Sequence, residues 1–199
     1  MVASSQDIHQ HGRIQGSVVF DKTTIIIQLT LPALHVVGFE YAPQNDSEKE
    51  LIKSSEERLK NMRFFEFFKI TPFLNRRQAL TLQPVVQHVH YSGELNSTNS
   101  KQQHEKHHHH DHHDEHNDNH NDHDQVTTNH SEFKIDIRYE TTQSMTISGI
   151  STLIFQLFSD VEYVVLDVVD LTQQFQLTFD KKQELQKFPK PIVVYSRNE

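Results

Sequence analysis

The sequence of 199 residues contains no cysteine. Disulfides, thiolate metal ligands and thiol catalysis are therefore excluded, although the absence is compatible with either an oxidising or a reducing compartment. Glycine is scarce as well, with five residues, and the chain has no P-loop, GxGxxG, GxSxG or HExxH pattern. Because no nucleophile is paired with a base by local spacing, we expect a protein that is not an enzyme.

Long apolar runs and basic clusters are also missing. No stretch approaches the roughly 18 apolar residues of a membrane-spanning helix, so we expect no membrane span. The formal net charge is −8, and Arg76 and Arg77 form a pair rather than a basic patch, which argues against a nucleic acid as partner. The opening MVASSQDIHQ lacks the features of a secretory signal. We therefore expect either a cytosolic protein or a chain whose signal has been removed.

One segment, from His104 to Asp124, is dense in imidazole and carboxylate groups. It contains ten His and seven Asp or Glu and no apolar side chain, so we expect it to lie in water. Both groups are good ligands for Zn²⁺, and Cu²⁺ or Ni²⁺ would also bind in vitro. A solvated linker without a role in metal binding is the alternative. The candidate ligands in this segment are His104, His107, His108, His109, His110, Asp111, His112, His113, Asp114, His116, His120 and His123.

Two further histidine pairs have the spacing of a strand face. His88 and His90 are two residues apart and precede His104 by only fourteen or so residues, so on a strand both would project from one side. His9 and His11 have the same spacing. For this second pair the alternative is two exposed histidines at a frayed terminus. We predict both pairs as candidate metal ligands.

Two isolated residues in the segment LPALHVVGFEYAP are also polar among apolar neighbours. Glu40 stands between Phe39 and Tyr41, and a carboxylate flanked by aromatic rings needs either water or a partner. We therefore include Glu40 among the candidate metal ligands. His35 lies within a short apolar run, and we expect it to be a hydrogen-bonded core residue rather than a ligand.

The pattern along the chain predicts an α+β fold. We expect two strands joined by a turn near Asp21, and a helix over about 47–65 that begins with a capping box at Ser47. Alternating residues over 133–139 predict a half-buried strand, more strands follow, and Pro189 indicates a C-terminal tail. We expect a single domain over 9–199, mainly antiparallel sheet with one principal helix, after a flexible N-terminus at 1–8. A disordered metal-binding loop at about 93–130 would interrupt this domain between two strands.

The chain resembles a known family, the zinc-regulated periplasmic zinc-binding proteins of the ZrgA type. The resemblance rests on HQHGRIQGSVVF, on LPALHVVGFEYAPQNDSEKE, on the internal His/Asp/Glu segment and on the strand-rich second half, over about residues 9–180. GFEYAP with the downstream acidic segment is its most specific part. The resemblance implies an exported, periplasmic α+β protein that binds Zn²⁺ and passes it to a zinc ABC transporter or to that transporter's binding protein.

Two functional hypotheses follow. In the first, the protein acts in zinc homeostasis, and the segment 104–124 is a capture loop that feeds or supplements a structured site. In the second, the protein is an interaction module whose acidic, His-rich arm docks a partner, and metal binding is incidental. A metallohydrolase would need an open metal position and a general base, and no residue can be named for that base.

Overall fold

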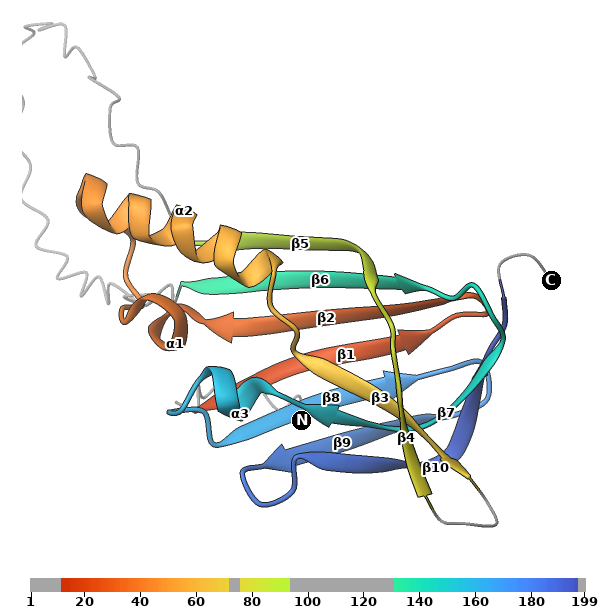
Figure 1. Cartoon of the computed structure of the whole chain (residues 1–199). Coiled ribbons are helices and arrows are strands. Elements are labelled where there is room, and N and C mark those ends of the chain that lie inside the picture. The colour runs from red at the N-terminus through yellow and green to blue at the C-terminus, as the bar shows by residue number, and fades with distance from the viewer. Residues whose placement is uncertain (1–11, 72–75, 94–130, 197–199) are drawn as a thin grey trace, which may run out of the picture.

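The computed structural model describes residues 12–71, 76–93 and 131–196. Strands take up 56% and helices 17% of these residues, and the strands form two sheets (Figure 1). The strands are β1 (Arg13–Phe20), β2 (Thr24–Pro32), β3 (Phe65–Thr71), β4 (Arg76–Leu80), β5 (Pro84–Ser92), β6 (Glu132–Glu140), β7 (Met145–Thr152), β8 (Tyr163–Val169), β9 (Gln174–Asp180) and β10 (Leu185–Val194). The helices are α1 (Ala33–Val37), α2 (Asp46–Lys60) and α3 (Ile154–Leu157).

The larger sheet has six strands in the order β5-β6-β2-β1-β8-β9. β1 and β2 form an antiparallel hairpin, and β1 pairs in parallel with β8 on its other side. β6 shows the predicted period of two, with Phe133, Ile135 and Ile137 buried and the residues between them exposed. Alternation of this kind fits a sheet that packs one face on the core and leaves the other in water.

The smaller sheet has four strands in the order β10-β7-β3-β4. Most of the run FFEFFKI lies in β3, whose branched and aromatic side chains suit a strand. The predicted C-terminal tail is wrong, because residues Leu185–Val194 form β10. Its pairing with β7 shifts register between Lys187 and Ile192. Pro189 and Pro191 fall in this interruption, where a missing N–H donor costs no ladder bond.

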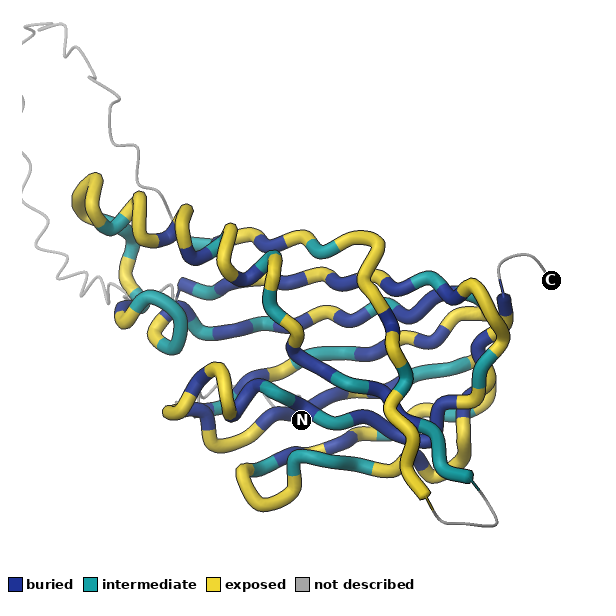
Figure 2. The backbone as a smooth tube through the Cα atoms, in the orientation of Figure 1, coloured by how far each residue is buried: buried dark blue, intermediate teal, exposed yellow. Residues whose placement is uncertain are grey.

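Aromatic side chains fill the space between the two sheets. Phe20 of the larger sheet makes edge-to-face contacts with Phe67 and Phe188 of the smaller sheet, at ring-centroid distances of 6.1 and 5.7 Å. Tyr139 of β6 meets Phe67 in the same way at 5.8 Å. Buried residues recur along both sheets where they face each other (Figure 2). This shared core packs against one face of the larger sheet, and the other face is exposed to solvent.

Helix α2 covers part of β5 at the edge of the larger sheet (Figure 1). It begins after Asn45, whose side chain accepts a hydrogen bond from the amide of Glu48 at 2.9 Å, so the cap is Asn45 rather than Ser47. Gln87 of β5 donates to the carbonyl of Leu59 at 2.7 Å. The amide of Tyr91 donates to the carboxylate of Glu56 at 2.8 Å. These bonds tie β5 to the helix through the outer edge of the strand.

The predicted α+β class with one principal helix is wrong. The protein is mostly β-sheet in two sheets with three short helices in the described residues, and the helix predicted for 47–65 spans Asp46–Lys60. β3, β4, β7 and β10 form a second sheet that the local patterns did not indicate. No helix in the described ranges is long and apolar enough to cross a membrane.

Candidate metal-binding residues

His88 and His90 lie on the open face of the larger sheet, as their spacing predicts. Both side chains are exposed, whereas Val89 and Tyr91 between and after them are buried. β5 is an edge strand of this sheet and pairs with β6 in antiparallel register. The two imidazoles are therefore held on one face of a paired strand and are accessible to solvent and to metal ions.

Across the strand pair, an acidic residue stands next to one of these histidines. His88 is opposite Asp136 of β6, and His90 is opposite Lys134. Directly opposite side chains on a sheet face have Cβ atoms about 5 Å apart. Asp136 also accepts a hydrogen bond of 2.8 Å from the side chain of Gln28 on β2. A shallow depression of about 350 Å³ lies here, lined by Ile26, Val86, His88, Asp136, Ile137 and Arg138.

This face offers an incomplete coordination sphere by itself. Zn²⁺ in proteins is usually bound by three or four ligands in a tetrahedral arrangement. Within residues 12–71, 76–93 and 131–196, no group of three or more His, Asp or Glu could hold a metal ion. His88 and Asp136 could supply two ligands, so further groups would have to come from elsewhere in the chain.

Glu40, the third predicted ligand in the described residues, lies beside the beginning of β6 in the connection between α1 and α2. Its carbonyl oxygen accepts a hydrogen bond of 3.1 Å from the amide of Ser131. The amide of Ala33 in turn donates to the carbonyl of Ser131 at 2.9 Å. Glu40 is half-buried. The structure does not bring Glu40, His88 and His90 into one metal-binding group.

The remaining predicted ligands fall outside the described residues, and their role stays a prediction. In the sequence, the long His-rich segment connects Gly93, directly after β5, to Ser131, directly before β6. Because β5 and β6 pair along their length, these two points lie at the same end of the sheet, which is also the end that carries α1 and α3 (Figure 1). The ligands concerned are His9, His11, His104, His107, His108, His109, His110, Asp111, His112, His113, Asp114, His116, His120 and His123.

His35, expected to be a core residue, makes a side-chain contact with a distant carboxylate that sequence reasoning missed. Its side chain on α1 is 3% exposed, and its Nδ1 contacts the carboxylate of Asp160 in the loop after α3. The two residues are 125 positions apart. No local pattern in the sequence connects them.

The other ring nitrogen of His35 has no hydrogen-bond partner. Nε2 is among the buried side-chain polar atoms of the described residues that lack one, as is the hydroxyl of Ser131. A buried polar atom left unsatisfied costs about 1–3 kcal/mol. Such atoms are rare in native proteins, and each one requires an explanation. His35 is thus buried and paired as expected, but only through one nitrogen.

The electrostatics of the pair fix which nitrogen carries the proton. Desolvation by itself would raise the pKa of Asp160, but the hydrogen bond with His35 and a bond to its own backbone amide outweigh it and hold this pKa below its ordinary value. An ionised carboxylate can only accept, so Nδ1 of His35 must be the donor. In the neutral ring, Nε2 then bears a lone pair.

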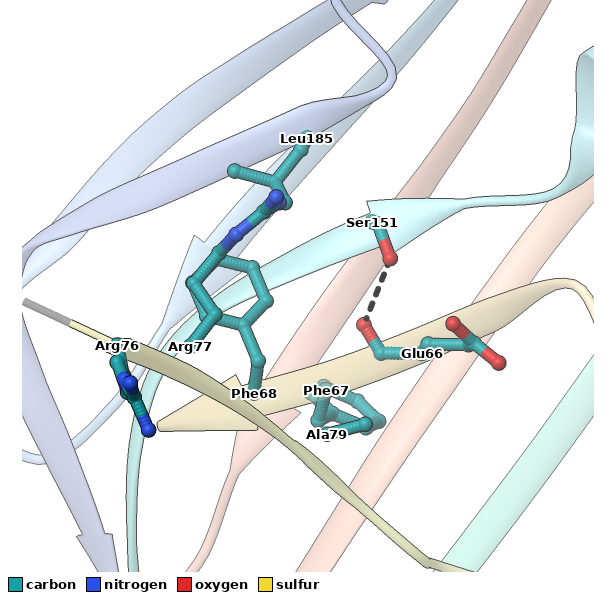
Figure 3. A pocket seen from close by; sticks show the side chains of 8 residues that line it. All are labelled: Glu66, Phe67, Phe68, Arg76, Arg77, Ala79, Ser151 and Leu185. Carbon is teal, nitrogen blue, oxygen red and sulfur yellow. Dashed lines mark hydrogen bonds between the residues drawn. The ribbon is translucent and has the colours of Figure 1, made fainter. Parts of the chain in front are cut away.

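A second surface depression, of about 480 Å³, belongs to the smaller sheet and has a different character. Arg76 and Arg77 lie on β4 beside the rings of β3, and the hydroxyl of Ser151 donates to the carbonyl of Glu66 at 3.4 Å (Figure 3). Its only acidic side chain is that of Glu66, and it has no histidine, so its chemistry does not suit a divalent cation. It is lined by Glu66, Phe67, Phe68, Arg76, Arg77, Ala79, Ser151 and Leu185.

Comparison with known proteins identifies the family. No individual curated protein matches the sequence. The family profile described as "ZrgA family zinc uptake protein" matches residues 8–188. This match covers the described strands from β1 to β9 and all of the candidate metal ligands, from His9 to His123. The chain therefore belongs to the ZrgA family of zinc uptake proteins.

Proposed function

We propose that the protein is a non-enzymatic zinc-binding protein of the periplasm. In this proposal the segment 104–124 captures Zn²⁺ and feeds or supplements a structured site on the β-sheet scaffold. Membership of a zinc uptake family supports the choice of metal. The imidazole and carboxylate groups of the segment support the capture role, because both coordinate Zn²⁺ when deprotonated.

The observation that carries the proposal is where this segment is inserted in the sequence. It separates two strands, β5 and β6, that pair from Val86–Arg138 to Ser92–Glu132. The two ends of the segment are therefore held close together by paired strands of a sheet that packs one face on the core. Many ligands tethered near one another raise the effective concentration of binding groups around a bound ion. His88 and His90 add two exposed imidazoles on the strand that leads into the segment.

The partner in this proposal is a zinc ABC transporter or its periplasmic binding protein. The acidic groups of the segment outnumber its single Lys106 by six charges, whereas the rest of the chain is nearly neutral. A local excess of negative charge attracts divalent cations and raises their local concentration. Release to a partner then requires only that the partner binds Zn²⁺ more tightly than the individual sites of the segment do.

Two matched variants of the full chain test the capture role. In one, the ten His of 104–124 are replaced by Asn. In the other, the seven Asp and Glu are replaced by Asn and Gln, and every His is kept. Isothermal titration with Zn²⁺ at neutral pH is expected to show that the first variant loses most of the bound zinc. The second variant is expected to lose less, because uncharged neighbours leave the imidazole ligands intact.

The alternative hypothesis, in which the segment is an arm that docks a partner through its charge, predicts a different result for these variants. If both variants bind as much zinc as the unmodified chain, the segment is not a capture loop. If only the loss of acidic groups changes binding to a transporter component, the segment acts as a docking arm and metal binding is incidental.

A further inference from the structure

β4 (Arg76–Leu80) is an edge strand of the smaller sheet and, within the described residues, pairs on one side only. It is the last strand in the order β10-β7-β3-β4, and its partner is β3. An edge strand directs about half of its N–H and C=O groups away from the sheet, where they can pair with another chain. Four of the five side chains of β4 are exposed. Solvent therefore reaches both the outer backbone edge and most of the side chains of this strand.

The other outer strands of the two sheets are hydrogen-bonded to neighbouring elements. β5 is bonded to α2. The side chain of Gln186 donates to the carbonyl of Thr178 on β9 at 2.7 Å, and that of Gln173 donates to the carbonyl of Lys190 on β10 at 3.0 Å. Outside the ladder with β3, no described residue makes a hydrogen bond of this kind to β4. β4 is thus the outer strand that is most accessible for pairing.

Two adjacent cations stand at the beginning of this edge. Arg76 and Arg77 are exposed, and neither forms an ion pair with an acid in the described ranges. Glu66, which lines the same depression, already pairs with Arg63 at 3.2 Å. The planar guanidinium group matches the geometry of a carboxylate and can bind it through two hydrogen bonds. Two charges are too few to hold a nucleic acid. The edge therefore favours a partner with carboxylate side chains.

The depression of about 480 Å³ beside β4 has room for a side chain of such a partner. Its lining includes the ring of Phe68, which is 4% exposed. A Cβ atom built on Gly149 would overlap this ring, so the glycine lets the ring lie across β7. Phe68 is opposite Ala79, and Arg77 is two residues before Ala79 on the same face, with its side chain running past the ring (Figure 3). An apolar surface next to a guanidinium group suits the methylenes and the carboxylate of a glutamate.

Charged side chains on an edge strand also serve to prevent pairing between copies of a protein. Lysine is the residue most often used for that purpose. Protection would need neither two adjacent guanidinium groups nor a depression with an aromatic ring beside them. The combination at β4 therefore favours binding over protection.

We propose that β4 binds an extended, acidic segment of a partner protein, which adds to the smaller sheet as a further strand. Main-chain hydrogen bonds along the outer edge of β4 hold the segment, and Arg76 and Arg77 select for its carboxylates. None of the candidate metal ligands belongs to this surface. The inference thus goes beyond the proposed function, and it stands or fails independently of zinc binding.

A fluorescently labelled, capped peptide of alternating Glu and Val, about as long as β4, tests the proposal. Its binding to the full chain is measured by anisotropy in the presence of a chelator, so that no metal ion bridges the two. The matched peptide has Gln in place of every Glu. We expect the Glu peptide to bind about tenfold more tightly, because two exposed ion pairs are formed, and to lose this advantage at high salt. Equal affinities for the two peptides, or no binding of either, would overturn the proposal.

Two methylated forms of the Glu peptide separate strand addition from attraction by charge. One form is N-methylated at every Glu and the other at every Val. Since alternate residues direct their N–H groups to the same edge of a strand, each form lacks the donors of one edge only. An added strand turns one edge to β4, so we expect one form to bind like the unmethylated peptide and the other to bind at least about tenfold more weakly. Equal affinities for the two forms would contradict strand addition.

The Arg76→Gln/Arg77→Gln double variant locates the binding site. Both side chains are exposed, so we expect it to fold and to bind the Glu peptide about tenfold more weakly. Lys134→Gln/Arg138→Gln is the matched control, because it removes two exposed cations from β6, which is paired on both sides. Equal losses in the two double variants would show that net charge, rather than the edge of β4, attracts the peptide.

Sedimentation velocity of the unmodified chain tests the other possible occupant of this edge. We expect a monomer with and without the Glu peptide. A dimer that the peptide dissociates would show that a second copy of the chain occupies β4, and it would overturn the choice of an acidic partner.

Discussion

Two sets of histidines in this protein show how differently a fold can present the same side chain. His88 and His90 stand in solvent on an open sheet face, with Asp136 in register beside the first of them. His35 is buried, and its ring contacts a carboxylate that is 125 positions away in the sequence. The exposed pair can be reached by any ion, but little fixes its side chains. The buried residue has a fixed ring and one unsatisfied nitrogen.

This contrast has a physical consequence for metal binding. An exposed side chain must lose rotamer freedom when it coordinates an ion, because few contacts restrain it beforehand. A ring already held by a carboxylate has lost that freedom on folding. The exposed pair therefore suits rapid collection of ions, whereas the ring of His35 is already held by Asp160.

Acidification is expected to have the largest effect, on the capture of zinc by the imidazole groups of the segment 104–124. Imidazole must be neutral to bind Zn²⁺, and its ordinary pKa is about 6.5, so a drop from about pH 7.5 to about 5.5 lowers the neutral fraction roughly tenfold for each ring. Capture of one ion by two imidazoles of this segment should thus weaken roughly a hundredfold. Isothermal titration at both pH values measures this difference, and equal zinc uptake at both would contradict the role of imidazole.

Replacement of His35 is expected to have the next largest effect, on stability in the absence of metal. His35→Ala removes a buried ring and its bond to Asp160, and we expect a loss of about 2 kcal/mol from the free energy of unfolding. Urea denaturation in the presence of a chelator measures it. Asp160 is 55% exposed and can be hydrated when its partner is lost. A change below about 0.5 kcal/mol would show that the pair contributes nothing to the fold.

Asp170 contrasts with Asp160, because its hydrogen-bond partners lie only two or three positions away in the sequence. Asp170 accepts hydrogen bonds from the side chain of Thr172 at 2.9 Å and from the amide of Gln173 at 2.8 Å. Desolvation opposes the ionised form, but these bonds outweigh it and lower the pKa of Asp170. Asp170→Ala should therefore cost about 1 kcal/mol at neutral pH.

The pH dependence of this cost has a definite sign. A carboxylate whose pKa is lower in the folded state stabilises the protein above its ordinary pKa, and the contribution is lost as the pH falls through the folded value. The difference in unfolding free energy between the unmodified protein and Asp170→Ala should therefore narrow below pH 3.8, the ordinary value. Urea denaturation along a pH series checks this, and a difference that widened on acidification would refute it.

The parts of the fold that could be predicted from sequence are those fixed by local pattern. The turn between β1 and β2, the shared face of His88 and His90, and the alternation in β6 all depend on residues within a few positions of one another. The predicted boundaries of the N-terminus at 1–8 and of the loop at 93–130 fall mainly outside the described residues and stay predictions.

The parts that could not be predicted depend on long-range pairing. β1 pairs in parallel with β8, joining Arg13 to Tyr163, and nothing in either strand indicates the other. The second sheet arises in the same way from β3, β7 and β10. His35 looked like an ordinary core residue because its partner, Asp160, is distant in sequence. Pro189 and Pro191 of β10 suggested a tail, because proline is rare inside a paired strand. The shift in register with β7 that accommodates them cannot be inferred from the sequence of one strand.

The smallest expected effect concerns the exposed histidines, and it tests whether they contribute to the stability of the fold. His88→Ala and His90→Ala should each change the free energy of unfolding of the metal-free protein by no more than about 0.5 kcal/mol, because exposed positions away from caps and cores tolerate substitution. Val89→Ala is the matched control on the same strand: its side chain is buried, so we expect a loss of about 1 kcal/mol or more. Urea denaturation of the three variants provides the comparison. If His88→Ala costs as much as Val89→Ala, the ring opposite Asp136 holds the edge of the sheet, and its availability to a metal ion would come at the expense of the fold.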